Sequence, residues 1–233
     1  MSRLVDDRAL REGIVGVCRR LYDRGLIAGP DGNVSVRLGD DTVLVTPTGM
    51  SKVDVGPDDL VLVGMDGQRL GGYREPSSEV SLHVRIYSRR PDVGAVVHAH
   101  PPVATGFAVA GVGFESYVLP ELIVQLGTVP LVPYATPGTA SLPDECEPYM
   151  SAHDAFLLAN HGAVTTGPTL LVAHQRMESL EHAARITLVA RQLGRVNELT
   201  PAQVAALTPA RSRPAVQGAD SESSARESKR GDR

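Results

Sequence analysis

The order of its helical and extended segments predicts that this chain folds as an α/β protein. Residues 6–25 carry apolar side chains at helical spacing, which is typical of a helix with one buried face. Residues 33–38 and 42–46 instead alternate apolar and polar positions around a Gly-Asp-Asp turn, which predicts a β-hairpin. The run 168–194 returns to helical spacing and predicts a long helix.

The segments between these landmarks continue the alternation of strands and helices. Short apolar runs bounded by proline and glycine predict buried strands, and a serine before an apolar-periodic run predicts a helix start. Ser77 or Ser78 is therefore expected to cap a helix that carries Glu79 in its first turn. We further expect strands at 60–63, 96–100, 129–134, 155–161 and 163–166, and helices at 103–110, 142–153 and 200–207.

Composition is that of an ordinary globular protein and argues against several classes of function. Hydrophobic residues make up 42% of the chain and charged residues 21%, and a formal net charge of -4 gives no reason to expect nucleic-acid binding. The N-terminus lacks a signal peptide's apolar core, and no stretch is long enough to span a bilayer. With Cys18 and Cys146 expected to be reduced thiols, these features predict a cytoplasmic protein.

Composition changes near Pro209, beyond which polar and charged residues dominate and Val216 is the one larger aliphatic residue. Such a segment cannot bury enough apolar surface to fold alone. We therefore predict one domain over residues 1–208 and a disordered polar tail over residues 209–233.

Two histidines close a short apolar run, Val96-Val97-His98-Ala99-His100. Side chains two apart on a strand project from the same face, so His98 and His100 can direct two imidazoles at one metal ion such as Zn²⁺. The alternative is one histidine in the core and one at the surface, because a His-x-His match alone needs structural context.

Two other segments offer side chains of the same kind. His161 ends the buried run 155–160, and Glu79 stands at a predicted helix start. Three imidazoles and a carboxylate form a plausible set of zinc ligands, although Glu79 is also explained as a favourable charge at a helix N-terminus. His83, one turn after Glu79, either supports a ligand or packs as an ordinary helix residue.

Glu121 is an isolated acid in the apolar run from Leu119 to Val124. Burial would tend to raise its pKa, which would suit a proton donor. The alternative is a surface carboxylate on a loop.

Six motifs occur in a fixed order along the chain: 32–37, 46–49, 76–79, 95–100, 134–139 and 160–162. Together they resemble the class II aldolase/adducin family, most of all its L-fuculose-phosphate aldolases, and the resemblance covers about residues 6–207. It implies a three-layer α/β/α sandwich with a largely antiparallel central sheet. It also implies homotetramers whose active sites lie at subunit boundaries.

The resemblance further implies a zinc-dependent aldolase that cleaves a ketose 1-phosphate to dihydroxyacetone phosphate and an aldehyde through an enediolate. By this resemblance the metal ligands are Glu79, His98, His100 and His161, and Glu79 is also the general acid/base. The positions that match the family's phosphate-binding residues are Gly32, Asn33, Thr48, Gly49, Ser77 and Ser78. Small residues and hydroxyls there would expose N–H groups, and a helix N-terminus favours an anion.

Two departures from the family concern the aldehyde end of the substrate. The L-fuculose-phosphate aldolases have a tyrosine where this chain has Leu119, with Tyr117 two residues away, and a second tyrosine in a C-terminal tail. No aromatic residue follows Phe156 here, and Glu121 lies near the position where family dehydratases carry a catalytic acid. A phosphoketose dehydratase, epimerase or decarboxylase on the same metal site is therefore the alternative function. An adducin-like interaction module without catalysis is disfavoured because all four ligands are present.

Overall fold

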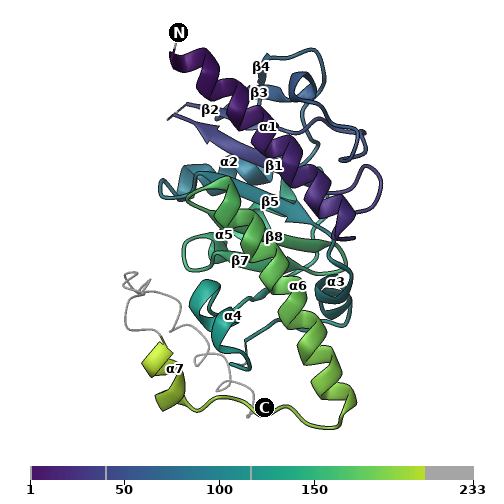
Figure 1. The fold of residues 1–233 in the computed structure, drawn as a ribbon, viewed down its shortest axis with the longest axis vertical. Coiled ribbons are helices and arrows are strands. Elements are labelled where there is room, and N and C mark those ends of the chain that lie inside the picture. Colours follow the sequence, from purple (N-terminus) through teal and green to yellow (C-terminus); the bar gives the residue numbers. More distant parts are fainter. Residues whose placement is uncertain (1, 40, 116, 208–233) are drawn as a thin grey trace, which may run out of the picture.

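The computed structural model describes residues 2–39, 41–115 and 117–207 and places them around an eight-stranded sheet (Figure 1). The strands lie in the order β4-β3-β2-β1-β5-β8-β7-β6. Their bounds are β1 Asn33–Leu38, β2 Thr42–Val45, β3 Val61–Gly64, β4 Arg69–Gly71, β5 Ala95–Ala99, β6 Leu131–Val132, β7 Ala155–Leu158 and β8 Gly162–Gly167. Among these strands only β6 and β7 pair in parallel, so the largely antiparallel sheet is confirmed.

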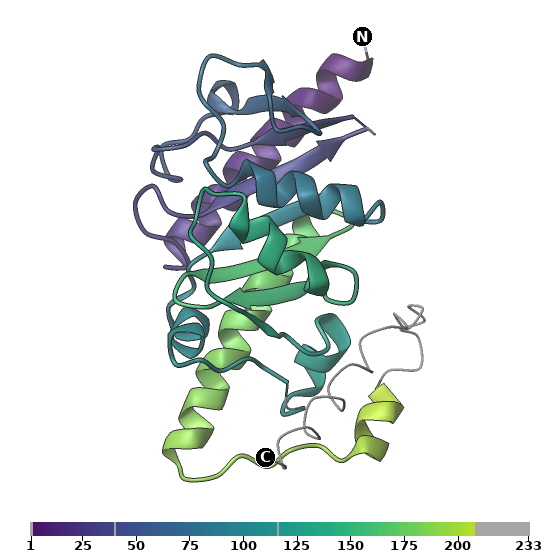
Figure 2. The ribbon, with the colours of Figure 1, turned by 180° about the vertical axis from the view of Figure 1, so that it is seen from behind.

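Helices cover both faces of the sheet, which confirms the three-layer α/β/α sandwich (Figures 1 and 2). One face is covered by α1 (Ser2–Asp23), α3 (Pro102–Val109), α4 (Pro120–Gln125) and α6 (Leu170–Gln192). The other is covered by α2 (Val80–Arg89) and α5 (Ser141–Met150). A short 3-10 helix, Pro57–Asp59, lies against α1, and α7 (Pro201–Leu207) lies against α4.

The alternation of side chains along β5 divides the core into two layers. Ala95, Val97 and Ala99 join the core beneath α1 and α6, whereas Val96 joins the core beneath α2 and α5. His98 has the same parity as Val96, so it lies on the α2–α5 face of the sheet. All five residues of β5 are buried, because the strand is central and covered on both faces.

Three details differ from the sequence prediction. The chain does not run on as one extended segment through residues 155–166 but reverses, so that β7 and β8 pair antiparallel. Asn160 makes this turn with a φ of 56°, a conformation that asparagine tolerates better than most residues. Strand β4 was missed because three residues are too few to show alternation. Helix α1 begins at Ser2, before the predicted start at residue 6.

Residues 209–233 lie outside the described part of the chain, so the domain boundary and the polar tail stay predictions. Within the described residues, no helix has the length and apolar character needed to cross a bilayer.

Candidate metal centre

Three histidines from two parts of the sheet meet at the C-terminal end of β5. His98 is the fourth residue of β5, His100 directly follows the strand, and His161 lies in the turn between β7 and β8. Their ring centroids are 5.0 Å apart for His98–His100, 4.7 Å for His98–His161 and 5.0 Å for His100–His161. One ligand nitrogen of each ring lies within 4.8 Å of the others, so the predicted convergence is present.

The surroundings of His98 and His100 direct an Nε2 lone pair from each ring toward one point. Nδ1 of His98 lies 3.0 Å from the Ala163 carbonyl oxygen, which only accepts, so Nδ1 carries the hydrogen. Nδ1 of His100 faces an Asp31 carboxylate oxygen at 3.5 Å in the same way. The two Nε2 atoms are 3.2 Å apart, and two lone pairs at that distance repel unless a cation or a proton lies between them.

Gly162 allows the close approach of β8 to this cluster. A Cβ atom on Gly162 would lie 2.5 Å from Cδ2 of His100 and 2.6 Å from the Ala99 carbonyl oxygen. Side chains do not tolerate such contacts with a main chain, so glycine is required at this position.

Glu79 completes the cluster from the N-terminus of α2. Its Oε2 lies 3.2 Å from His98 Nε2 and accepts a hydrogen bond from Asn33 Nδ2 at 2.9 Å. Its Oε1 lies 3.4 Å from His161 Nε2 and, within the described residues, is buried without a hydrogen-bond donor. A buried carboxylate oxygen without a partner is costly, and a cation among the imidazoles would satisfy it. The donor set of nitrogen and carboxylate oxygen therefore fits a divalent metal such as zinc.

The helix cap differs from the sequence prediction, because Glu79 itself is the N-cap of α2. Ser77 lies one turn earlier, where its carbonyl accepts from Val80 N at 3.0 Å and its Oγ accepts from Glu79 N at 3.3 Å. Ser77 thus shapes the turn before the helix, and the carboxylate is placed at the helix end next to the imidazoles.

Burial prepares these groups to bind a cation. It lowers the pKa of His100 and of His161 to about 4, with a further contribution from the neighbouring His98. Burial alone would raise the pKa of Glu79, but His98, His161 and the Asn33 hydrogen bond together hold it below its usual range. His100 and His161 are therefore neutral and Glu79 is ionised at neutral pH, as metal ligands must be.

Two turns beside α2 bring together four of the residues expected at the phosphate. Thr48 N donates to the Glu75 carbonyl at 3.1 Å and Ser77 N to the Thr46 carbonyl at 3.1 Å, so the turns lie side by side. Thr48, Gly49 and Ser78 are exposed, whereas Ser77 is buried.

The other two expected phosphate residues lie against the histidines. Gly32 has a φ of 71°, and a Cβ there would lie 2.8 Å from the His98 carbonyl oxygen. Asn33 pairs with His98 across β1 and β5, and its side chain is buried between Glu79 and His83. One amide hydrogen of Asn33 contacts Glu79, which leaves the second for a ligand.

Comparison with known proteins identifies the family. The sequence model of the Class II Aldolase and Adducin N-terminal domain matches residues 12–188, more than half of the chain. The chain belongs to the class II aldolase/adducin family.

Curated relatives and solved structures of this family resemble about four fifths of the chain. A 3-oxo-tetronate 4-phosphate decarboxylase of Pectobacterium atrosepticum is 34% identical over 81% of this chain and 88% of its own length. A 5-methylthioribulose-1-phosphate/5-deoxyribulose-1-phosphate aldolase of Rhodospirillum rubrum is 38% identical over 76% of this chain and 79% of its own. The structure of an L-fuculose 1-phosphate aldolase matches with a TM-score of 0.80 at 28% identity, covering 84% of this chain and 93% of its own. These relatives are lyases, so the expectation of an enzyme is confirmed.

In this class II aldolase-family chain, Glu121 lies apart from the histidines. It is exposed in the first turn of α4, so the burial that would have made it a proton donor is absent. Helix α4 and helix α3, which follows the His100 strand end, lie on opposite sides of the view in Figure 1. Leu119 is the N-cap of α4, and Tyr117 is 36% exposed on the preceding segment. Glu121 therefore lacks the burial from which a proton-donor role was expected.

Lys52 is a functional candidate that sequence reasoning missed. It is 1% exposed, and its Nζ donates to the Pro30 carbonyl at 2.8 Å and to the Met50 carbonyl at 2.9 Å. It thereby joins the turn before Gly32 to the turn after Gly49, and burial lowers its pKa. The available signal was its rarity, because Lys52 and Lys229 are the only lysines in an arginine-rich sequence.

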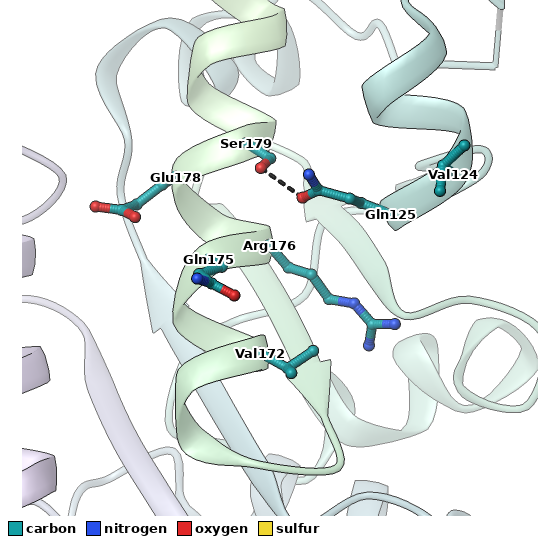
Figure 3. A pocket seen from close by; sticks show the side chains of 7 residues that line it. All are labelled: Val124, Gln125, Val172, Gln175, Arg176, Glu178 and Ser179. Atoms are coloured by element: carbon teal, nitrogen blue, oxygen red, sulfur yellow. Dashed lines mark hydrogen bonds between the residues drawn. The ribbon is translucent and has the colours of Figure 1, made fainter.

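A cavity of about 530 Å³ lies away from the histidines, between α4 and α6 (Figure 3). Its lining residues are Val124, Gln125, Val172, Gln175, Arg176, Glu178 and Ser179. Arg176 pairs with Asp154 at 2.8 Å, and Ser179 Oγ donates to Gln125 Oε1 at 2.6 Å. Because these polar groups already bind one another, the histidine cluster is the better candidate for the active site.

Proposed function

We propose that this protein breaks a carbon–carbon bond in a small phosphorylated hydroxyketone and releases dihydroxyacetone phosphate. The observation that carries this proposal is the cluster of three imidazoles and Glu79 beside the paired turns of Thr48 and Ser77. Its relatives are named for 3-oxo-tetronate 4-phosphate and for ketose 1-phosphates. In both compounds a ketone stands between a phosphorylated CH₂ and a hydroxylated carbon. Breaking the next carbon–carbon bond leaves the same enediolate in each case.

The side chains have distinct roles in this proposal. His98, His100, His161 and Glu79 would hold Zn²⁺ or another divalent metal, which as a Lewis acid polarises the ketone when bound. Glu79 Oε1, which accepts no hydrogen bond within the described residues, would take up a proton from water or from the substrate hydroxyl and pass it to the carbon that loses its substituent. Oε2 would meanwhile stay hydrogen-bonded to Asn33.

The phosphate would be bound by the small and hydroxylated residues of the neighbouring turns. These are Gly32, Asn33, Thr48, Gly49, Ser77 and Ser78, next to the N-terminus of α2. Main-chain N–H groups and hydroxyls suit an anion, and anchoring the phosphate would align the reacting bond with Glu79.

The leaving group distinguishes the two candidate reactions. Aldol cleavage requires a base that removes the proton from the hydroxyl of the leaving carbon, whereas decarboxylation releases CO₂ without that step. This chain has Leu119 in place of the family tyrosine and no aromatic residue after Phe156. We therefore place decarboxylation of a 3-oxo-tetronate 4-phosphate first. Aldol cleavage of a ketose 1-phosphate, L-fuculose 1-phosphate included, is second, supported by the aldolase relative at 38% identity. A dehydratase would need Glu121 at the site, supplied by a neighbour in the tetramer that the resemblance implies.

The test uses zinc-loaded protein and three phosphorylated substrates, namely 3-oxo-tetronate 4-phosphate, 5-deoxyribulose 1-phosphate and L-fuculose 1-phosphate. Dihydroxyacetone phosphate is followed by coupled reduction with NADH, and CO₂ is measured separately. We expect dihydroxyacetone phosphate and CO₂ in equal amounts from the tetronate. Dihydroxyacetone phosphate from a ketose 1-phosphate instead would make the enzyme an aldolase.

Two controls test the site itself. His98→Asn should lose the bound metal, measured by elemental analysis, together with the activity. Glu79→Gln should have a strongly reduced kcat. Release of no dihydroxyacetone phosphate from any of the three substrates would refute the proposal, as would equal turnover of unphosphorylated analogues.

A further inference from the structure

A line of buried hydrogen bonds runs from α2 through β1 to Glu79. Tyr87 Oη lies 2.8 Å from Ser35 Oγ, which lies 2.6 Å from Nδ1 of His83. Nε2 of His83 contacts Oδ1 of Asn33, and Nδ2 of Asn33 donates to Glu79 Oε2 at 2.9 Å. None of these five residues is more than 7% exposed, so water does not compete for the hydrogen bonds.

The Glu79 carboxylate at the end of this line fixes the direction of each hydrogen bond. The Glu79 carboxylate only accepts, so Asn33 must turn its amide nitrogen toward Glu79 and its oxygen toward His83. That oxygen also only accepts, so Nε2 of His83 must carry a hydrogen. Full burial lowers the pKa of His83 to about 3, so the ring is neutral and Nδ1 has no hydrogen. Nδ1 therefore accepts from Ser35, and Ser35 accepts from Tyr87.

We propose that His83 is a positioning residue that sets the orientation of Asn33 and, through Asn33, holds Glu79 in place. The Nε2–H of His83 keeps the amide nitrogen of Asn33 on Glu79 Oε2. Oε1 is thereby left for the metal and for proton transfer. The proposal rests on the proposed function for the role of Glu79, but the hydrogen-bond directions stand without it.

A donor on His83 is needed because an asparagine side chain can present either end. A flipped Asn33 would place its carbonyl oxygen against the Glu79 carboxylate, and two acceptors repel. It would also leave the Oε2 atom buried without a donor. His83 lies four residues after Glu79, so one face of α2 carries both the carboxylate and the group that orients its partner.

The first test is the tautomer of His83 in the wild-type protein. Nitrogen-15 NMR of labelled imidazoles distinguishes the Nε2–H form, the Nδ1–H form and the charged ring. We expect His83 to be neutral with the hydrogen on Nε2, unchanged between about pH 6 and pH 8, where an unperturbed histidine titrates. An Nδ1–H tautomer or a charged ring in that range would overturn the proposal. This test needs no substrate, so it is independent of the proposed function.

The second test compares two amides in place of His83. In His83→Gln the amide nitrogen reaches the place of Nε2 and can donate to Asn33. In His83→Asn the shorter amide reaches only the place of Nδ1, so it can bind Ser35 but offers Asn33 no donor. Zinc affinity is measured by competition with a chelating dye, and kcat with the substrate that the protein turns over.

We expect His83→Asn to weaken zinc binding by about tenfold or more, the usual effect of losing a group that supports a ligand, and to lower kcat. His83→Gln should stay close to wild type. Wild-type zinc affinity in His83→Asn, or equal losses in both variants, would overturn the proposal.

Controls separate orientation from damage to the fold. Both substitutions remove the same buried ring, so their loss of thermal stability should be similar. Ile86→Val removes a buried methyl group from the same helix but lies outside the hydrogen-bond line. It should lower the melting temperature and leave zinc affinity unchanged. If both His83 variants fail to fold, the tautomer of His83 in the wild-type protein still tests the proposal.

Discussion

The metal half and the phosphate half of the site are built in different ways. His98 and Glu79 are buried, and they are held by the strand β5, the end of α2 and hydrogen bonds to Ala163 and Asn33. Thr48, by contrast, lies on an exposed turn, as do Gly49 and Ser78. His98 and Glu79 are therefore held by contacts within the protein, whereas Thr48, Gly49 and Ser78 face water beside the buried Ser77 and Asn33.

This difference suggests that the groups needed by every reaction of the site and the groups that select the substrate lie in different parts of the molecule. In the proposed mechanism decarboxylation and aldol cleavage share the same ligands and the same proton donor, and these lie at the ends of β5 and β7 and at the start of α2. The position that would separate the two reactions, Leu119, is the N-cap of α4 and is only partly buried. A rigid core can thus serve several reactions while the surface changes.

Gly162→Ala disturbs the metal half and should have the largest effect, a loss of zinc affinity. The new Cβ would lie 2.5 Å from His100 Cδ2 and 2.6 Å from the Ala99 carbonyl, so His100 must move. We expect zinc affinity to fall by about 10- to 100-fold, as when a group that orients a ligand is lost. Gly106→Ala is the matched control, because a Cβ there meets nothing within 4 Å. It should raise the unfolding free energy by about 0.5–1 kcal/mol, since Gly106 lies inside α3. Unchanged zinc affinity in Gly162→Ala would show that the glycine does not fix His100.

Lys52→Met tests whether Lys52 links the turn at Pro30 to the turn at Met50. Methionine fills a similar space but leaves the Pro30 and Met50 carbonyls without their donor. Each lost partner costs about 1–3 kcal/mol, so we expect the unfolding free energy from urea titration to fall by roughly 2–5 kcal/mol. Zinc content should stay near that of the wild type because neither turn supplies a ligand. A variant as stable as the wild type would show that Lys52 does not clamp the turns.

Much of the metal half was predictable from sequence, for a physical reason. His98 and His100 follow a buried strand, where a period of two fixes the face, and the turn at Asn160 carries His161 to the same end of the sheet. The role of His83 was left open, because spacing on α2 shows which residues share a face but not that Asn33 of β1 lies between His83 and Glu79.

The remaining features depend on contacts between distant segments. Lys52 is important because it touches residues on both sides of the hairpin β1–β2, which no local pattern encodes. The apolar neighbours of Glu121 left a buried acid and a surface carboxylate both open, and the structure shows the second, because α4 turns Leu122 and Ile123 inward and Glu121 outward. Helical periodicity over six residues was too short to reveal this.

Ser77→Ala and Thr48→Val test the phosphate half, at one buried and one exposed hydroxyl, and should act mainly on KM. A hydroxyl that binds the phosphate does so in the substrate complex and in the transition state alike, so kcat should change little. One hydrogen bond to a charged group contributes about 1.5–3 kcal/mol, which corresponds to a KM roughly ten- to a hundredfold higher. Ser88→Ala is the control, since Ser88 Oγ binds the Val84 carbonyl near the other end of α2. A fall in kcat without a change in KM would remove these residues from the phosphate pocket.

Glu121→Gln should have the smallest effect, and it tests how far the site is confined to one chain. Glu121 is exposed, and the acid/base role is proposed for Glu79, so we expect kcat to fall less than about tenfold and zinc content to stay unchanged. A fall of roughly 10²-fold with full zinc content would instead identify Glu121 as an acid/base supplied to a neighbouring copy. Mixing Glu121→Gln with Glu79→Gln would then restore part of the activity, because some sites in the mixed oligomer would receive both intact carboxylates. Formation of a dehydrated product in that mixture would move the assignment to a dehydratase.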